Sequence, residues 1–290
     1  MTTNLLVTEK VEQFLRTQSK VFVRHLQLKN NENHSDYHEV CIVVYHDFGE
    51  HGQRYLDFIS ILLKKLFSEK IKAQALIIDF PGHGKSSGPR GHIPSIENLA
   101  LDCIDFINSQ NLCHDTLFLG NSLGALINLF IMHNCLHLID KKIVGLVALN
   151  PAFKLNWQLP HTIQKFLKTK TPYLSKLRLP FSVNGSAYFG KESEGETFDR
   201  DPLICHTPTV ATFLEIQDIG KKLRTSSYYL DIPVFMGISD LDQLYNTQVS
   251  ELYSRGLNKG TLKKYSNAPH DLIYREIGEN VIKDIVQWYE

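Results

Sequence analysis

Five short apolar runs, separated by stretches with helical spacing, constrain the fold of this chain more than any other feature. The runs cover residues 41–48, 73–80, 116–122, 143–151 and 232–240. Helical spacing is seen in residues 52–67, 95–109, 123–134 and 279–290. Strands that are apolar on both faces are typical of parallel sheets buried between helices. The alternation therefore predicts an α/β fold, with a mostly parallel sheet covered by helices on both faces.

Two segments depart from this alternation. Residues 21–28 alternate apolar and polar side chains, which predicts an antiparallel edge strand. Residues 152–230 hold five of the eleven prolines and no long apolar run. We interpret 152–230 as a helical cap subdomain inserted between late strands, over one edge of the sheet. The core then consists of residues 1–151 and 231–290, because the strands on either side of the cap must share one sheet.

Composition excludes several classes of protein. The 290 residues include 31 basic and 31 acidic side chains, so no net charge attracts nucleic acid. No apolar run approaches the roughly 18 residues of a membrane-spanning helix. The first residues do not resemble a secretory signal. The five cysteines form no CxxC pair, which argues against zinc and redox motifs. These features predict a cytoplasmic protein.

A serine in a strand-to-helix turn is the candidate nucleophile. Gly120-Asn121-Ser122-Leu123-Gly124 has the form G-x-S-x-G, and it follows the apolar run TLFL and precedes the apolar stretch LGALINLF. Such a turn strains the serine backbone and exposes its hydroxyl at the carboxyl edge of the sheet. The flanking glycines allow the strand and the helix to approach closely. Ser122 is therefore predicted to be a catalytic nucleophile.

A serine hydroxyl needs a base and an orienting acid, which follow it in the order Ser, Asp/Glu, His in this kind of fold. His270 lies after the last strand candidate, TLKKY, and no other histidine follows residue 206. His270 is therefore the predicted base. Asp240 and Asp242 both follow the run VFMGIS, and position alone does not choose between them as the acid.

Three stretches resemble the monoacylglycerol lipase and lysophospholipase branch of the serine aminopeptidase-like α/β-hydrolases. Residues 46–55 (HDFGEHGQRY) resemble H-G-x-G-E-H-x-x-R-Y. Residues 79–92 (DFPGHGKSSGPRGH) resemble D-x-x-G-H-G-x-S-x-G-x-R-G-H. Residues 120–124 stand where this family has G-H-S-M-G. The resemblance implies an α/β-hydrolase fold.

The resemblance also implies roles for individual residues. Counted from Pro233 the family aspartate is Asp242, whereas counted from Gly237 it is Asp240. We choose Asp242 because an apolar pair, Leu244-Tyr245, follows it closely. The oxyanion hole would consist of the backbone N–H groups of Phe48 and Leu123. No metal or organic cofactor is implied.

Asp47 is the main departure from the family pattern, which has glycine at this position. A carboxylate beside a developing oxyanion would repel it unless the side chain points away. Asn121 also differs, because histidine is commoner before the family nucleophile.

The implied function is hydrolysis of carboxylic esters of single-chain lipids, monoacylglycerols or lysophospholipids. One alternative is a hydrolase-fold ligand-binding protein with little turnover, which Asp47 favours. Another is a proline-releasing peptidase, which needs acidic groups for a free amino terminus; Glu192, Glu194 and Glu196 are expected to form only a solvated loop. Residues 165–178 mix five basic residues with Phe, Leu and Tyr. This basic stretch of the cap predicts transient, peripheral contact with a membrane surface, or else a solvated face.

Overall fold

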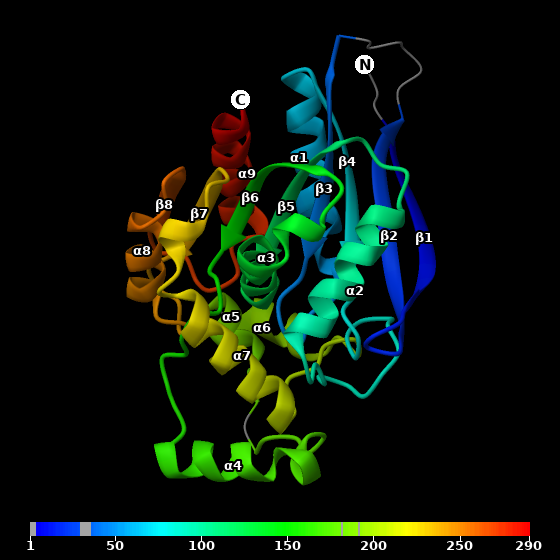
Figure 1. The fold of residues 1–290 in the computed structure, drawn as a ribbon. Helices are drawn as coiled ribbons and strands as arrows, with labels where there is room; N and C mark the ends of the chain where they lie inside the picture. The colour runs from blue at the N-terminus through cyan, green and yellow to red at the C-terminus, as the bar shows by residue number, and fades with distance from the viewer. Residues whose placement is uncertain (1–3, 30–35, 181, 191) are drawn as a thin grey trace.

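The computed structural model describes residues 4–29, 36–180, 182–190 and 192–290, and its centre is one eight-stranded sheet. The strand order is β1-β2-β4-β3-β5-β6-β7-β8 (Figure 1). The strands are β1 (Asn4–Phe14), β2 (Ser19–Lys29), β3 (His38–Tyr45), β4 (Ile71–Ile78), β5 (Asp115–Asn121), β6 (Lys142–Leu149), β7 (Val234–Ser239) and β8 (Gly260–Tyr265). From β4 to β8 all neighbouring strands are parallel. The predicted mostly parallel α/β-hydrolase sheet is therefore confirmed.

The helices lie in two layers, one on each face of the sheet (Figure 1). The core helices are η1 (Gly52–Tyr55), α1 (Leu56–Ser68), α2 (Ile96–Ser109), α3 (Leu123–Asn134), η2 (Leu136–Leu138), α8 (Thr247–Arg255) and α9 (Arg275–Tyr289). Side chains of α1 and α9 form one buried cluster with one face of the central strands. Side chains of α2, α3 and α8 pack against the opposite face. The central strands β3, β5, β6 and β7 are buried on both sides over most of their length, which explains their continuous apolar runs.

The start of α2 illustrates how local sequence sets an element boundary. Ser95 has extended backbone geometry, and its side chain accepts a hydrogen bond from the backbone N–H of Asn98 at 3.1 Å. This bond satisfies one of the unpaired N–H groups of the first helical turn.

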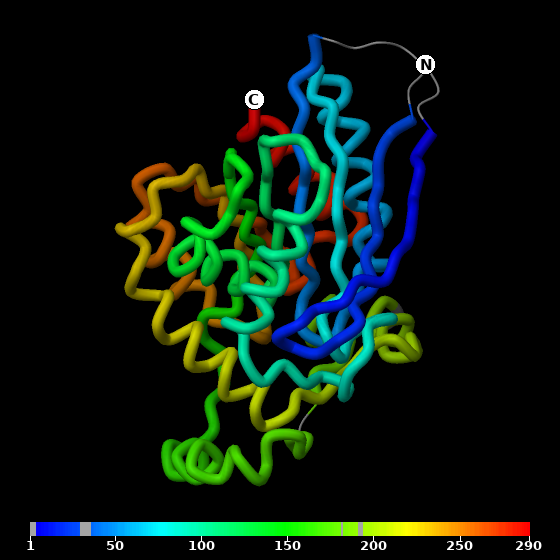
Figure 2. Tube along the Cα trace, turned by 45° about the vertical axis from the view of Figure 1, so that its right-hand side comes forward, coloured from blue at the N-terminus to red at the C-terminus, as the bar shows by residue number. Residues whose placement is uncertain are grey.

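The edge of the sheet differs from the prediction for residues 21–28. β2 pairs antiparallel with β4, as expected, but it is not an edge strand, because β1 pairs with it from Asn4–Lys29 to Phe14–Ser19. Figure 2 shows this β1–β2 hairpin along one side of the molecule. β1 was missed because most of its side chains are exposed or half-buried, so its sequence has no marked apolar face. The sequence analysis also missed α8. The last helix, α9, begins at Arg275 rather than at the predicted residue 279.

Residues 152–230 contain no strand of the central sheet among those that the structure describes. Their helices are α4 (His161–Leu174), α5 (Gly185–Phe189), α6 (Glu192–Asp199), α7 (Val210–Leu223) and η3 (Ser227–Tyr229). In Figure 1, α4, α5, α6 and α7 lie toward the carboxyl ends of the parallel strands, and α4 lies outermost. The expected solvated loop at residues 192–196 is wrong, because these residues belong to α6.

The close crossing of α3 and β3 depends on Gly124. A methyl group at this position would lie 2.1 Å from the carbonyl oxygen of Tyr45 and 2.9 Å from that of His46. Both neighbours are backbone atoms, which cannot move aside as the end of a side chain can. Only glycine lets the first turn of α3 approach the end of β3 this closely.

We expect Gly124→Ala to lower the free energy of unfolding by about 3 kcal/mol, because the collision must be relieved by shifting a helix or a central strand. Gly190→Ala is the matched control. Gly190 has a φ of 63°, but an added methyl there would contact nothing closer than 3.7 Å. The control should lose only about 1 kcal/mol from backbone strain. Urea unfolding measures both values, and equal losses would contradict the role given to the α3–β3 crossing.

Candidate active site

Ser122 lies in the sharp turn between β5 and α3. Its backbone has φ 50° and ψ −106°, a strained geometry for a residue with a side chain. Three backbone bonds hold the turn: the N–H of Ser122 donates to the carbonyl of Leu149, and its carbonyl accepts from the N–H groups of Leu126 and Ala152. The residue is buried, and no hydrogen bond joins its Oγ to His270 within the described part of the chain.

Asp242, and not Asp240, contacts His270. The Nδ1 of His270 and the Oδ2 of Asp242 are 2.7 Å apart, and both side chains are fully buried. The other carboxylate oxygen of Asp242 accepts the backbone N–H groups of Leu244 and Tyr245, at 2.7 and 3.0 Å. Asp240 instead accepts a backbone bond from Ala268. The register counted from Pro233 thus selects the aspartate that can orient the imidazole.

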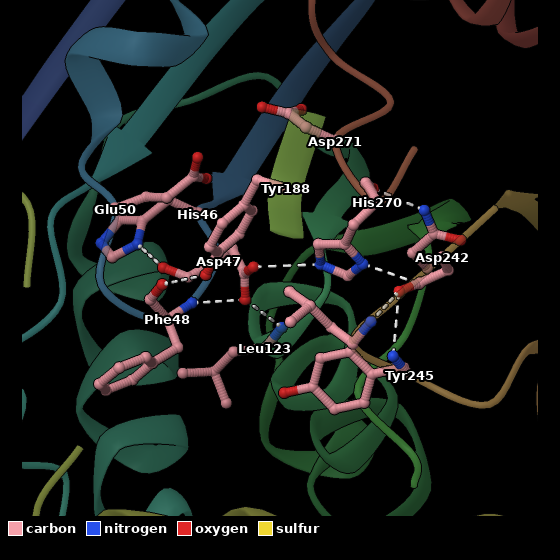
Figure 3. A network of polar contacts seen from close by, with 12 residues as sticks. His46, Asp47, Phe48, Glu50, Leu123, Tyr188, Asp242, Tyr245, His270 and Asp271 are labelled. Carbon is pink, nitrogen blue, oxygen red and sulfur yellow. Dashed lines mark hydrogen bonds and ion pairs between the residues drawn. The ribbon is translucent and has the colours of Figure 1, made fainter. Parts of the chain in front are cut away.

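Asp47 points into the site rather than away from it (Figure 3). Its Oδ1 accepts the backbone N–H groups of Phe48, at 2.5 Å, and of Leu123, at 3.1 Å. Its Oδ2 lies 3.2 Å from the Nε2 of His270. The two N–H groups expected to form the oxyanion hole therefore do converge on one oxygen atom. In this structure that oxygen belongs to the protein itself.

The two carboxylates determine the charge of His270. Burial alone would lower the pKa of its imidazole, but Asp242 and Asp47 outweigh burial and raise the pKa well above 6.5. Burial likewise disfavours the charged form of Asp242, yet the imidazolium and the backbone N–H groups hold the pKa of this carboxyl below 3.8. The two carboxylates, one at each ring nitrogen, therefore favour the protonated form of His270.

The loop that carries Asp47 is fixed by polar contacts on both sides. The Nδ1 of His46 bonds to the carbonyl of Asp47 at 2.6 Å, and its Nε2 accepts the N–H of Phe80 at 2.9 Å. Burial lowers the pKa of His46 to about 4, so this ring is neutral. The N–H of Asp47 donates to the hydroxyl of Tyr55. The main chain at Asp47 is therefore held in place independently of the Asp47 carboxylate.

A second group of buried charged side chains, centred on Arg54, lies near the group around His270. Arg54 bonds Glu50 at 2.9 Å and Asp271 at 3.4 Å. Burial raises the pKa of Glu50 to about 7, and the charge of Arg54 opposes that rise. Arg54 also lies over the rings of Phe189 and Phe198 from the cap. The residues 50–55 of the first motif thus connect the Asp47 loop to α5 and α6.

Two tyrosines enclose the imidazole, and the sequence analysis missed both. Tyr188, from α5, and Tyr245, after β7, have ring centroids 5.4 and 5.6 Å from that of His270. The hydroxyl of Tyr188 donates to the carbonyl of Phe48 at 3.1 Å. The apolar pair after Asp242 indicated Tyr245 only as a packing residue, and no motif marked Tyr188.

The glycine-rich stretch 79–92 supports the loops around the site. Asp79 accepts bonds from Arg24, from the N–H of Gly52 and from the N–H of Lys85, and Arg24 and Asp79 are fully buried. Arg90 donates to the carbonyl of Gly84 at 3.0 Å and to that of Leu203. These contacts join residues 79–92 to β2, to η1 and, through Leu203, to the cap.

Other chemistry has less support. Across residues 4–29, 36–180, 182–190 and 192–290, no group of three or more His, Cys, Asp or Glu side chains could hold a metal ion. His133 bonds the hydroxyl of Tyr253 at 2.7 Å. Glu194, from the peptidase alternative, is paired with Arg275 at 2.7 Å. No helix within the described residues is both long and apolar enough to cross a membrane.

Comparisons with known proteins agree with the geometry. The family model described as serine aminopeptidase, S33, matches residues 36–277. Rat monoglyceride lipase is 24% identical over 263 residues, which cover 86% of this chain and 82% of the lipase. The uncharacterised protein YnbC of Escherichia coli K12 is 27% identical over 179 residues. That match covers 59% of this chain but only 29% of YnbC.

Solved structures show the same fold. A monoacylglycerol lipase from Paleococcus ferrophilus superposes with a TM-score of 0.75 at 22% identity, covering 87% of this chain and 96% of the lipase. A soluble variant of Saccharomyces cerevisiae monoglyceride lipase, in complex with a substrate analogue, gives 0.77 at 18% identity, covering 97% and 94%. The family match spans most of the chain, and the fold agrees throughout. The protein therefore belongs to the serine aminopeptidase S33 family of α/β-hydrolases.

Proposed function

We propose that this protein is a serine hydrolase that cleaves carboxylic esters of single-chain lipids through an acyl-enzyme. The observation that carries the proposal is the convergence of the Phe48 and Leu123 N–H groups on one anionic oxygen, next to an imidazole held by Asp242. Two donors aimed at one point are what an ester oxyanion requires. The strained turn at Ser122 supplies a nucleophile beside them.

In the proposed mechanism, the Oγ of Ser122 attacks the ester carbonyl carbon while the Nε2 of His270 takes the hydroxyl proton. Asp242 holds the imidazole by Nδ1 and stabilises its cation. The alcohol then leaves with the proton from Nε2, which gives the acyl-serine. Water attacks this ester, its proton passes to His270, and the carboxylic acid leaves as Ser122 recovers the proton.

The substrate class is inferred from the relatives and from the surface of the cap. Relatives that cover most of the chain are named monoglyceride or monoacylglycerol lipases. The segment from α4 to Leu177 also exposes large apolar side chains: Ile163, Phe166, Tyr173 and Leu177. Exposed apolar residues interspersed with lysines are typical of segments that lie on a lipid surface. Both features favour monoacylglycerols or lysophospholipids over soluble esters.

A second candidate function is a ligand-binding protein with little turnover. It is favoured by the presence of the Asp47 carboxylate on both oxyanion donors. The two functions differ in whether Ser122 can be acylated. A fluorophosphonate in excess should label a hydrolase at Ser122, whereas a protein that only binds its ligand should stay unlabelled.

Ser122→Ala tests the proposed function directly. We expect the variant to lose about 10³-fold or more in kcat on p-nitrophenyl esters, monoacylglycerols and lysophospholipids, because the nucleophile is gone. Ser250→Ala, which removes a buried hydroxyl from α8, should keep its activity. Wild-type activity without a preference for single-chain lipids would contradict the substrate class. Near-normal activity in Ser122→Ala would contradict the mechanism.

The choice between the two aspartates gives a separate prediction. Asp242→Asn should lower kcat by about 10⁴-fold, because an amide favours the wrong tautomer of His270. Asp240→Asn should reduce kcat only slightly, since Asp240 contacts a backbone N–H and not the imidazole. Steady-state kinetics on one soluble ester is sufficient, and the reverse order of effects would assign the acid to Asp240.

The basic surface of the cap gives a prediction about lipid interfaces. Lys168 pairs with Asp218, so we choose Lys165, Lys170, Lys176 and Arg178 for substitution by Gln. Each basic residue near an anionic surface contributes about 1 kcal/mol, so adsorption to anionic vesicles should weaken by at least 10²-fold. Hydrolysis of a short soluble ester should be unchanged.

The control for this variant changes four exposed lysines elsewhere, Lys29, Lys64, Lys65 and Lys283. Vesicle sedimentation should show no comparable loss for the control, and added salt should weaken adsorption of the wild type. Equal losses in both variants would mean that only total charge matters. A loss on the soluble ester would mean that the segment shapes the pocket.

A further inference from the structure

The oxyanion hole of this protein is filled by a carboxylate of the same chain. Asp47 is only 1% exposed, and it uses both oxygens: one on the N–H groups of Phe48 and Leu123, the other on His270. Figure 3 shows the carboxylate between the two donors on one side and the imidazole on the other. It therefore occupies the place of the charge that develops during ester hydrolysis.

The contacts favour an anion at this place before any substrate arrives. Hydrogen bonds from N–H groups to a charged acceptor are roughly twice as strong as those between neutral groups. The imidazolium of His270 adds a charged partner at 3.2 Å. An ester carbonyl is neutral, so it gains less from the same donors until the tetrahedral oxyanion forms. Asp47 thus competes most strongly against the ground state of the substrate.

We propose that Asp47 is an internal competitor for the oxyanion hole, and that its carboxylate must leave Phe48, Leu123 and His270 before Ser122 can be acylated. The inference rests on the proposed function, because it concerns the same site. It adds a residue that sets the rate and the pH dependence of the reaction.

Only the side chain of Asp47 needs to move. The carbonyl of Asp47 is bonded by His46 and its N–H is bonded to Tyr55, and neither contact involves the carboxylate. Rotation about the side-chain bonds can therefore empty the hole while the Phe48 and Leu123 donors stay in place. The N–H donors of the hole are thus held in place by the main chain, and only the Asp47 carboxylate has to move.

The imidazole couples this step to pH. Asp47 and Asp242 together raise the pKa of His270 against the effect of burial. Below that pKa the imidazolium retains Asp47; above it the ion pair is lost and the ring becomes the base that Ser122 needs. Both effects make activity rise with pH. The titratable or charged groups that surround the pair are Tyr188 from α5, His46, Glu50, Arg54, Tyr55, Tyr245 and Asp271.

Two substitutions at Asp47 distinguish the effect of filling the oxyanion hole from the effect of the carboxylate's charge. Asp47→Ala empties the hole and removes one carboxylate from His270. Asp47→Asn keeps an oxygen for both N–H donors and offers an N–H to the imidazole, but it carries no charge. Asp47 does not have a positive φ, so neither variant strains the backbone. Equal unfolding midpoints serve as the folding control, and Asp47→Gly replaces Asp47→Ala if that variant does not fold.

The experiment measures kcat/KM for p-nitrophenyl butyrate and the rate of Ser122 labelling by a fluorophosphonate between pH 6 and 10. At pH 7 we expect Asp47→Ala to exceed the wild type by at least about tenfold in both rates. Its activity should reach half of its maximum at a lower pH than that of the wild type. Asp47→Asn should share this lower midpoint but react more slowly than Asp47→Ala, because its hole is still occupied.

A binding measurement that needs no turnover completes the test. Decanoate presents the same carboxylate as Asp47, so calorimetry at pH 7 should find it bound at least about tenfold more tightly to Asp47→Ala than to the wild type. If no variant is labelled but decanoate binding follows this order, the proposed function fails and the inference about Asp47 stands. Equal decanoate affinity of the two proteins overturns the inference. It is also overturned if Asp47→Ala is labelled but no faster than the wild type, and the midpoint of its pH–activity profile is unchanged.

Discussion

The close approach of α3 to the end of β3 is the constraint on which the site depends. Gly124 faces the carbonyl oxygens of Tyr45 and His46 with no side chain between them. This contact brings the N–H of Leu123, at the start of α3, next to the N–H of Phe48, just beyond β3. Two donors that are 75 residues apart in the chain thereby point at one oxygen. The turn from β5 into α3 also gives Ser122 its strained backbone, so the proposed nucleophile and the proposed oxyanion hole have one structural origin.

Much of this arrangement could be predicted from sequence, because the relevant signals are local. The apolar runs predicted the parallel strands, and G-x-S-x-G between a strand and a helix predicted the turn at Ser122. Register from Pro233 selected Asp242, the aspartate that contacts His270. β1 was missed for a physical reason: a strand covered on one edge only, and mostly exposed, does not need an apolar pattern. α6 was missed because its closely spaced glutamates suggested a solvated loop rather than a helix.

The orientation of Asp47 could not be predicted in the same way. Only a condition followed from the sequence: the carboxylate would repel a developing oxyanion unless its side chain pointed away. That condition concerns only the transition state. The two N–H donors and the imidazole also attract a carboxylate of the chain itself, and Asp47 is the carboxylate that reaches them. The direction of the Asp47 side chain follows from charges that β3, α3 and the His270 loop bring together. These elements are far apart in the sequence, so no local pattern predicts their joint effect.

The buried charged side chains around the site share one arrangement, in which each cation lies between two carboxylates. His270 lies between the carboxylates of Asp242 and Asp47, and Arg54 lies between those of Glu50 and Asp271. Each cation is shared by two acids, so each set carries an excess negative charge in a site with little access to water. Burial raises the pKa of Glu50 and of Asp271, which allows the second set to reduce its charge by binding a proton. The first set has no such relief at Asp242, whose pKa is lowered. We therefore expect the first set to be relieved by the proposed movement of Asp47, which takes one carboxylate away from the buried pair of His270 and Asp242.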